Sequence, residues 1–186
     1  MKSVFLVTSN LGKVEEISKH LEKFGIKVIG KEMEIPEIGE EQETIAKSKA
    51  EFAVERLEVP VIVEDTGLYF AAYKNFPGIR SKFVFQAIGY EGILKLLENK
   101  SRKAYFKTIV AYCEPNKEPK TFVGINPGTL SENVRGVSHP RLPYDSIFIP
   151  DGDDRTFAEM TKEEKAKYSA RAKAAEEFAQ WFSKKE

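Results

Sequence analysis

One stretch near the middle of the chain restricts the possible folds more strongly than any other. Residues 61–63 are β-branched, and the run ends at two adjacent carboxylates, Glu64 and Asp65, followed by Thr66 and Gly67. Such a short apolar run is typical of a strand buried on both faces, as in α/β proteins. The carboxylates are therefore expected where the strand leaves the sheet, at the edge where open α/β folds bind their ligands.

Only one of the two carboxylates is expected to face such a site. Side chains alternate along a strand, so Glu64 and Asp65 point in opposite directions. We predict that Asp65 faces the ligand, because Thr66 and Gly67 beside it let a ligand approach the backbone closely. A strand end with a solvated acidic turn is the alternative interpretation.

Composition excludes several classes of protein and of metal site. The 186 residues are enough for one domain with a substantial core. Lys plus Arg and Asp plus Glu both total 29, so the chain has no overall field that attracts nucleic acid. A single cysteine, Cys113, excludes an internal disulfide, and with only His20 and His139 a Cys/His metal cluster is also excluded. A hard cation bound by carboxylates remains open.

Membrane and export signals are not recognisable in this sequence. No apolar run approaches the roughly 18 residues that a membrane helix requires. Residues 1–8 are too short for a secretory signal peptide. We therefore expect a cytoplasmic protein with no membrane partner.

The first half of the chain alternates between predicted strands and helices. A strand at residues 3–8 leads through a turn into a helix that is capped by Ser9 or Asn10 and stopped by Gly25. A strand at 26–29 follows. A linker containing Pro36, expected to be packed because Ile35 and Ile38 flank it, then leads to a helix at about 41–57 and to the strand at 61–64.

The second half departs from this alternation. After an irregular segment at 69–80 and a helix somewhere in 81–99, two strands at 104–113 and 120–125 are expected to pair antiparallel. Residues 126–143 are predicted to form a long functional loop. A last strand at 144–150 and a terminal helix opened by a capping box at 161–164 complete the chain. The mixture of strand directions predicts a mixed sheet.

A phosphate site is predicted at the turn before the first helix. The turn consists of Thr8, Ser9, Asn10, Leu11, Gly12 and Lys13. Helix N-termini present free N–H groups and a partial positive charge, which favour phosphate. The spacing of a Walker A loop is absent. A capped helix with a solvated lysine is the alternative.

Two carboxylates and one lysine are candidates for a metal and phosphate site. Glu37, held beside Pro36, could join Asp65 as a ligand for Mg²⁺, which takes one or two carboxylates and shares its other positions with water and phosphate oxygens. Lys49 is expected near the same site. The alternative for Glu37 and Lys49 is that both are solvated surface residues.

A third group of residues has the chemistry of base recognition. Arg141, Leu142, Pro143, Tyr144 and Asp145 precede Lys165, Ser169 and Arg171, all three of which are expected on the terminal helix. A nucleobase requires an aromatic face and hydrogen-bonding groups at its edge. Alternatively, Tyr144 is a core residue and the cations are solvated.

Nearly the whole chain resembles the inosine triphosphate pyrophosphatases, also called Ham1-like non-standard purine nucleotide pyrophosphatases, and looks like an archaeal-type member. The matching motifs are Thr8, Asn10, Lys13 and Glu16; Glu64-Asp65-Thr66-Gly67-Leu68; Pro77-Gly78; Leu142-Pro143-Tyr144-Asp145; and Ser169-Ala170-Arg171. There are two departures, because Leu142 replaces an aromatic residue and Ala170 replaces a histidine. Both bear on purine selectivity more than on hydrolysis, and Tyr144 is then expected to take more of the stacking.

The resemblance implies a fold and a reaction. The fold is α/β, an elongated mixed β-sheet with flanking helices, forming one domain over residues 1–186 with two lobes around a central cleft that holds the active site. The reaction cleaves inosine, deoxyinosine and xanthosine triphosphates at the α-phosphorus, giving the monophosphate and pyrophosphate with Mg²⁺. A homodimer is also implied, and the aromatic segment 69–85 is a candidate for part of its interface; the alternative is that its aromatic residues simply pack in the core.

The resemblance also implies roles for individual residues. Asp65 and Lys13 are catalytic, and Glu37 and Asp65 hold the metal. The predicted substrate-binding residues are Thr8, Ser9, Asn10, Leu11, Gly12, Lys13, Lys49, Thr66, Leu142, Pro143, Tyr144, Asp145, Lys165, Ser169, Ala170 and Arg171. Asp145 and Arg171 are expected to read the 6-oxo edge of the purine, which would reject adenine.

Three other functions are compatible with parts of this pattern. A Maf-like pyrophosphatase shares the architecture and the reaction but prefers other bases. A regulatory module would bind a triphosphate at the same turn without turnover. A nucleic-acid-binding module is disfavoured by the zero net charge and would have to show binding that weakens steeply with salt.

Overall fold

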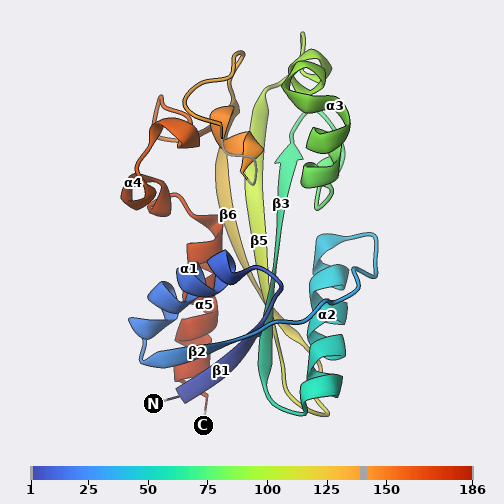
Figure 1. Ribbon diagram of the computed structural model, residues 1–186, viewed down its shortest axis with the longest axis vertical. Coiled ribbons are helices and arrows are strands. Elements are labelled where there is room, and N and C mark those ends of the chain that lie inside the picture. Colours follow the sequence, from blue (N-terminus) through green and yellow to red (C-terminus); the bar gives the residue numbers. More distant parts are fainter. Residues whose placement is uncertain (1, 139–141, 186) are drawn as a thin grey trace. The chain divides into compact units, whose positions relative to one another are not determined.

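The computed structural model describes residues 2–138 and 142–185, and for Leu11 the backbone only (Figure 1). The chain divides into two compact units. The first consists of Met1–Thr66, Thr108–Gly124 and Ala170–Glu186, and the second of Gly67–Lys107 and Ile125–Ser169. Three strands, β3 (Val61–Phe70), β5 (Lys103–Cys113) and β6 (Lys120–Leu130), contribute residues to both units. His139 and Arg141 lie outside the described residues.

A mixed sheet connects the elements. Its strand order is β2-β1-β3-β5-β6-β7, and β4 pairs with β3. The strands are β1 (Lys2–Val7), β2 (Ile26–Lys31), β3 (Val61–Phe70), β4 (Pro77–Gly78), β5 (Lys103–Cys113), β6 (Lys120–Leu130) and β7 (Phe148–Pro150). β1 is parallel to β2 and β3, whereas β3–β4 and β6–β7 are antiparallel. The predicted mixed sheet is confirmed, and β5 and β6 are neighbours as expected.

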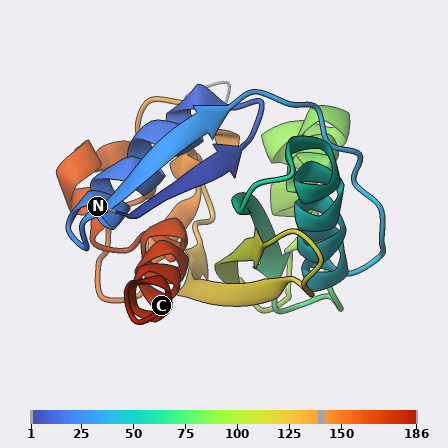
Figure 2. The same cartoon turned by 90° about the horizontal axis from the view of Figure 1, so that it is seen from below.

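The first unit is a sheet covered by helices on both faces. The helices are α1 (Leu11–Glu22), α2 (Gln42–Leu57) and α5 (Ala170–Ser183). Ile62 on β3 and Val110 on β5 pack in one hydrophobic cluster with α1 and α5. Val63 and Ile109 pack in another cluster with α2. Figure 2 shows α1 and α5 on one side of the strands and α2 on the other. This burial on both faces explains the continuous apolar run at 61–63.

The first helix begins and ends where its residues predict. The Asn10 side chain accepts a hydrogen bond from the Gly12 N–H at 3.0 Å, so Asn10 rather than Ser9 is the cap. Gly25 has φ +70°, a left-handed conformation that few other residues adopt readily, and β2 begins at the next residue.

The second unit has its own core and shorter helices. These are α3 (Ser81–Leu96), the 3₁₀ helices η1 (Pro143–Ser146) and η2 (Phe157–Glu159), and α4 (Lys162–Ala166). Gly89 interrupts α3 with φ +59° and ψ −166°, which kinks the helix. A cluster of buried residues that includes Phe70, Tyr144 and Phe148 forms the core of this unit.

Two predicted strands continue beyond their expected ends. β3 does not stop at Glu64 but runs through the carboxylates to Phe70, because Leu68 and Phe70 alternate into the second core and Leu68 pairs with Gly78 of β4. β6 does not end at 125 but runs to Leu130, because residues 128–130 pair with β7. Part of the expected loop at 126–143 is therefore strand.

Two further predictions near the C-terminus are wrong. Residues 144–150 are not one strand, since η1 occupies Pro143–Ser146 and β7 only Phe148–Pro150. The capping box at Thr161 opens only α4, and the N–H groups of Tyr168 and Ser169 then bond to carbonyls three residues back, which breaks the helix before α5. Lys165 and Ser169 consequently do not share a helix with Arg171.

Candidate active site

Glu64 and Asp65 lie next to each other on β3 and have different neighbours. Glu64 contacts Lys13 of α1 and Arg171 of α5. Asp65 contacts Lys49 of α2. These helices cover opposite faces of the strands, so the prediction that the two carboxylates point in opposite directions is confirmed. We call the first group the Glu64 cluster and the second the Asp65 cluster.

The Glu64 cluster surrounds a fully buried carboxylate with donors. The Glu64 side chain has no exposed surface; its Oε2 lies 2.5 Å from Lys13 Nζ and its Oε1 lies 3.2 Å from Arg171 Nε. Thr66 Oγ1 also donates to Glu64 Oε1, and Arg171 is held from its other side by Glu16. Two cations and two carboxylates therefore balance within this cluster.

These partners keep Glu64 ionised. Burial alone would raise its pKa, but the charges of Arg171 and Lys13, with hydrogen bonds from Lys13 and Thr66, hold the pKa at about 2. Burial also acts against the charge of Arg171, yet Glu64 and Glu16 keep its pKa raised. The cluster is charged throughout the neutral range.

The negative charge of the Asp65 cluster is neutralised less completely. Lys49 Nζ lies 3.1 Å from Asp65 Oδ1 and 3.0 Å from Glu37 Oε1. Burial raises the pKa of Asp65, and the Lys49 ammonium offsets this only in part. For Lys49, burial lowers the pKa, but the charge of Asp65 and the hydrogen bond that Lys49 donates to Glu37 outweigh it, so the pKa is raised. Glu37, Asp65 and Lys49 are thus brought together, as the sequence predicted.

One oxygen of Asp65 is left over. Within the described part of the chain, Asp65 Oδ2 is buried without a hydrogen-bond partner. Glu64 Oε2 also lacks a hydrogen bond of good geometry, but the Lys13 ammonium lies 2.5 Å from it. Lys49 shows that a cation fits between the Asp65 and Glu37 carboxylates. Among the described residues no group of three or more His, Cys, Asp or Glu side chains forms a metal site. Two carboxylates are nevertheless enough for Mg²⁺ when water and phosphate oxygens complete its shell.

The position of Glu37 differs from the expectation in one respect. Its linker is packed only in part: Ile35 packs against the cluster that contains Val63, whereas the Glu37 side chain is 57% exposed and Ile38 is 62% exposed. The contact with Lys49, not packing by Pro36, holds Glu37 beside Asp65.

The predicted phosphate turn is ordered by its own side chains. Thr8 Oγ1 accepts from the Asn10 N–H at 3.1 Å, and the Asn10 side chain accepts from the Gly12 N–H. Ser9 is exposed, and Leu11 opens α1. Lys13 extends from this turn to Glu64, so the structure joins the turn to the carboxylate pair.

The residues predicted to read a base are divided between the units. In the second unit Asp145 forms an ion pair with Lys165. Tyr144 is only 5% exposed, its ring packs edge-on against Phe70 and Phe85, and its hydroxyl donates to the Ser81 carbonyl at 2.8 Å. Little of that ring is available to stack on a nucleobase. Burial also raises the pKa of the Tyr144 hydroxyl.

The remaining residues of this group are placed as follows. Leu142 is 49% exposed, directly before Pro143, whose carbonyl accepts from the Tyr90 hydroxyl at 2.7 Å. Ser169 lies in the break before α5, and Ala170 is buried at its start. In the first unit Arg171 is held by the two glutamates of the Glu64 cluster.

Sequence reasoning missed three residues of this site. Glu64 was passed over for Asp65, although it anchors two predicted site residues. Gln42 is 4% exposed and its amide donates to the Asp65 carbonyl at 3.1 Å. Thr108 on β5 lies with its hydroxyl 2.7 Å from that of Thr66. A buried polar residue within an apolar strand, as Thr108 is, was the available signal.

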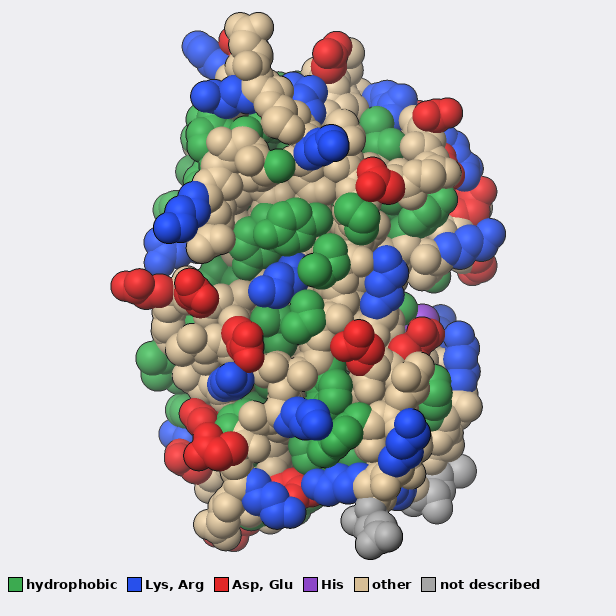
Figure 3. Space-filling view, turned by 180° about the vertical axis from the view of Figure 1, so that it is seen from behind, with side chains coloured by type: hydrophobic (Ala, Val, Ile, Leu, Met, Phe, Trp, Pro, Cys, Tyr) green, Lys and Arg blue, Asp and Glu red, His purple; other side chains and the backbone are tan. Residues whose placement is uncertain are grey.

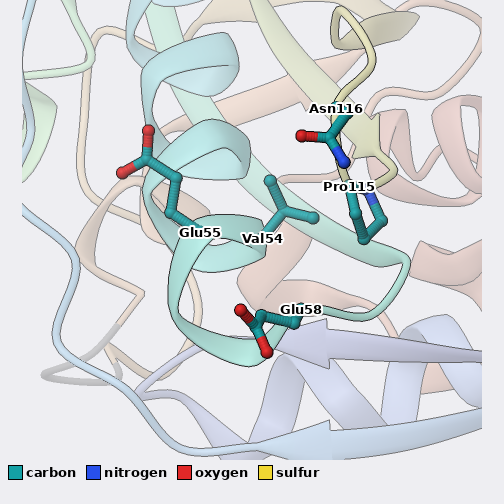
Figure 4. A pocket seen from close by; sticks show the side chains of 5 residues that line it. All are labelled: Val54, Glu55, Glu58, Pro115 and Asn116. Carbon is teal, nitrogen blue, oxygen red and sulfur yellow. The ribbon is translucent and has the colours of Figure 1, made fainter.

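A separate pocket lies at the C-terminal end of α2. Val54, Glu55, Glu58, Pro115 and Asn116 line it (Figure 4). None of these residues belongs to the predicted site. Two glutamates at its rim disfavour a triphosphate. On the face shown in Figure 3, acidic and basic side chains are interspersed.

Comparison with solved structures identifies the fold. The protein is a mixed α/β protein similar to a HAM1 protein from Coxiella burnetii, with a TM-score of 0.83, 26% identity and coverage of 100% of both chains. The predicted fold class is thereby confirmed. The Ham1 family matches residues 4–181, and the chain belongs to this family.

Two curated relatives are similar over nearly their whole length. One, from Methanopyrus kandleri, is 46% identical over 181 residues, covering 96% of this chain and 95% of the relative. The other, from Thermococcus kodakarensis, is 44% identical over 177 residues, covering 94% of each. Both are named dITP/XTP pyrophosphatase. Among the described residues no helix has the length and apolar character to cross a membrane.

Proposed function

We propose that this protein is a dITP/XTP pyrophosphatase, a hydrolase that releases pyrophosphate and a nucleoside monophosphate from deoxyinosine and xanthosine triphosphates. Its membership of the Ham1 family and the names of its relatives support the activity. The observation that carries the mechanism is the buried Asp65 oxygen without a partner, beside a cation that Asp65 shares with Glu37.

Asp65 and Glu37 are the residues that would hold Mg²⁺. Both already accept from one ammonium group, and the free oxygen of Asp65 adds a further ligand position. When bound, the ion would neutralise phosphate charge and polarise the phosphoryl group under attack. Lys49 would then be released from its two carboxylates and available to the phosphates.

Asp65 is also the residue proposed to accept the proton of the attacking water. Without the ion, burial raises its pKa. An ion bound to one oxygen would lower the pKa of the carboxylate, so the proton would be accepted by the other oxygen. Gln42 holds the Asp65 backbone in place through its carbonyl. Glu64 is unsuited to this role, because its oxygens already accept from Lys13, Arg171 and Thr66.

The turn at residues 8–13 is proposed to bind the phosphates. Lys13 has three N–H donors, so one can remain on Glu64 while others reach the ligand. This charge assists departure of pyrophosphate, since phosphoryl transfer depends mainly on positioning and electrostatic stabilisation.

Base selection is proposed to involve Asp145 and Lys165 of the second unit. The charged pair of Asp145 and Lys165 supplies both an acceptor and a donor for a purine edge. Leu142, half exposed, offers an apolar surface where an aromatic residue was expected. Because Tyr144 is buried, stacking by Leu142 rather than Tyr144 is favoured.

A product assay tests the proposal. Deoxyinosine, xanthosine and inosine triphosphates, and separately ATP, GTP and pyrimidine triphosphates, are incubated with Mg²⁺ and the products are separated by chromatography. Monophosphate plus pyrophosphate from the first three, with little turnover of the others, is expected. Diphosphate plus phosphate would mean attack at the γ-phosphorus, and preference for another base would indicate Maf-like specificity. Binding without turnover would indicate the regulatory module.

A homodimer is proposed as the working form. Phe70, Tyr73, Phe76 and Phe85 of the candidate segment 69–85 pack in the core of the second unit. Phe83, which is 69% exposed, is therefore the aromatic residue proposed for the interface. Light scattering after size-exclusion chromatography should give twice the mass of 21.1 kDa, and Phe83→Glu should lower it. An unchanged dimer in that variant would exclude this segment.

A further inference from the structure

A chain of hydroxyl groups connects Glu64 to the neighbouring strand β5. Thr66 Oγ1 hydrogen-bonds Glu64 Oε1, and the same atom lies 2.7 Å from Oγ1 of Thr108. Thr108 lies on β5 and is 1% exposed, so its hydroxyl is shielded from solvent and contacts the hydroxyl of Thr66. The family motifs and the predicted site do not include it.

The direction of these hydrogen bonds follows from the donors around Glu64. Lysine and arginine side chains only donate, so both oxygens of Glu64 act as acceptors. The single hydroxyl proton of Thr66 is therefore given to Glu64. Since Thr66 has no second proton, the 2.7 Å contact requires Thr108 to donate to Thr66. Every proton in the chain points toward Glu64.

This arrangement fixes the orientation of a carboxylate that holds two predicted substrate contacts. One oxygen of Glu64 receives Thr66 and Arg171, and the other lies 2.5 Å from Lys13. Rotation of the carboxylate would move both cations. Without the hydroxyl of Thr108, the Thr66 hydroxyl loses one of its two partners, and its side-chain rotamer is held less firmly. The position of Lys13 and Arg171 then becomes less defined.

We propose that Thr108 is a positioning residue for the pyrophosphatase reaction, acting through Thr66 and Glu64 on Lys13 and Arg171. The inference rests on the proposed function of this site. In this proposal the hydroxyl of Thr66 also positions Glu64. Its proton is therefore given to Glu64 and not to the substrate. Misplacement of a positioning group by about 1 Å can lower a rate about a hundredfold, and one hydrogen bond removed is expected to cost about tenfold.

Two substitutions at Thr108 separate positioning from packing. Thr108→Val keeps the branched shape and removes the hydroxyl, whereas Thr108→Ser keeps the hydroxyl and removes a buried methyl group. We expect kcat for deoxyinosine triphosphate to fall about tenfold in Thr108→Val and to stay within about twofold of wild type in Thr108→Ser. Thermal unfolding should show that Thr108→Ser is less stable than wild type. If Thr108 had a purely structural role, kcat would fall in neither variant as long as the protein is folded.

Double substitution tests the chain itself. Thr66→Val should lower kcat as Thr108→Val does, and the double variant should be no slower than Thr66→Val alone, because both act through one path. Thr156→Val is the matched control, since Thr156 is fully buried and its hydroxyl donates to Glu159 at 3.0 Å in the second unit. Its effect on stability should leave kcat unchanged. Additive losses for Thr66 and Thr108, or wild-type kcat in Thr108→Val, would overturn the proposal.

A binding measurement keeps this test separate from the proposed activity. Calorimetry with tripolyphosphate, which offers the phosphates without a base, should show weaker binding to Thr108→Val than to Thr108→Ser. If wild type binds tripolyphosphate but hydrolyses no nucleotide, the proposed function fails while the positioning role is still tested. Equal binding by the two variants would count against the positioning role.

Discussion

The Glu64 and Asp65 clusters place two adjacent carboxylates in opposite environments. Glu64 is surrounded by two cations and a hydroxyl, and its pKa is held at about 2. Asp65 shares one cation with Glu37, keeps an oxygen without a partner and has a raised pKa. A satisfied carboxylate suits a positioning role, whereas an incompletely satisfied one is available to a metal ion or a proton.

The difference follows from the helices on each face rather than from the strand. Both residues are buried, at 4% and 6% exposure, so desolvation acts on both. On one face α1 and α5 each supply a cation, while on the other α2 supplies only Lys49. Environment sets the acid–base role of a carboxylate, as in other enzymes with paired acids.

The largest expected effect is on catalysis. Asp65→Asn removes the proposed base and one metal ligand, so turnover of deoxyinosine triphosphate should fall about a thousandfold or more. The product assay measures this loss. Asp151→Asn, at an exposed aspartate, is the matched control and should retain full activity. Substantial activity in Asp65→Asn would assign water activation to another group.

The next effect separates the two clusters by stability. Glu64→Gln leaves Lys13 and Arg171 without their buried counter-charge and should cost about 3 to 5 kcal/mol of unfolding free energy. Asp65→Asn should be neutral or stabilising, because the fold disfavours the Asp65 charge. Urea denaturation at neutral pH compares them. Equal losses in both variants would remove the contrast between the clusters.

The pH dependence of stability should have opposite signs at the two sites. Glu64 has its pKa lowered from 4.5 to about 2, so its contribution is complete above pH 4.5 and is lost as the pH falls toward 2. The difference corresponds to roughly 3 kcal/mol. The gap between wild type and Glu64→Gln in urea denaturation should therefore shrink over that window.

Asp65 should behave in the reverse way. Because its pKa is raised above the ordinary 3.8, the folded state holds the proton more tightly, and stability is lost as the pH rises through the raised pKa. Any increase in the free energy of unfolding that Asp65→Asn produces should thus vanish at low pH. A gain that persists when Asp65 is protonated would contradict the assigned cause.

The smallest effect concerns the cation that the carboxylates share. Lys49→Gln removes the competing ammonium, so Mn²⁺ used as a probe without nucleotide should bind about tenfold more tightly. Titration calorimetry measures this affinity. Lys47→Gln is the matched control, because Lys47 lies on the same helix and pairs with Glu43 instead. Unchanged Mn²⁺ affinity in Lys49→Gln would mean that the metal does not use this pair of carboxylates.

Local patterns were sufficient for much of the fold. Asn10 and Gly25 bound the first helix through their own conformational preferences, and these preferences do not depend on the rest of the chain. The alternation of side chains along β3 was enough to separate Glu64 from Asp65. The expectation that Lys49 lies near Asp65 agrees with the ion pair between them, whereas Lys13 contacts the neighbouring Glu64 on the other face.

Errors arose where pairing partners override local signals. Pro127 and Gly128 suggested a loop, but pairing with β7 keeps them in β6. Gly67 suggested a strand end, but the neighbouring Gly78 backbone would lie 2.9 Å from a Cβ there, so Gly67 permits close packing within a continuing strand. The roles of Leu142, Asp145 and the remaining binding residues stay predictions.

The amino-acid pattern alone established the family, the order of most strands and helices, and the opposite orientation of the two carboxylates, because these depend on short-range periodicity and on motifs. Only the folded chain revealed which carboxylate is satisfied. Glu64 receives Lys13, Thr66 and Arg171, whose positions span more than half of the sequence. Ion pairs between such distant residues leave no local pattern, since tertiary packing alone brings their side chains together.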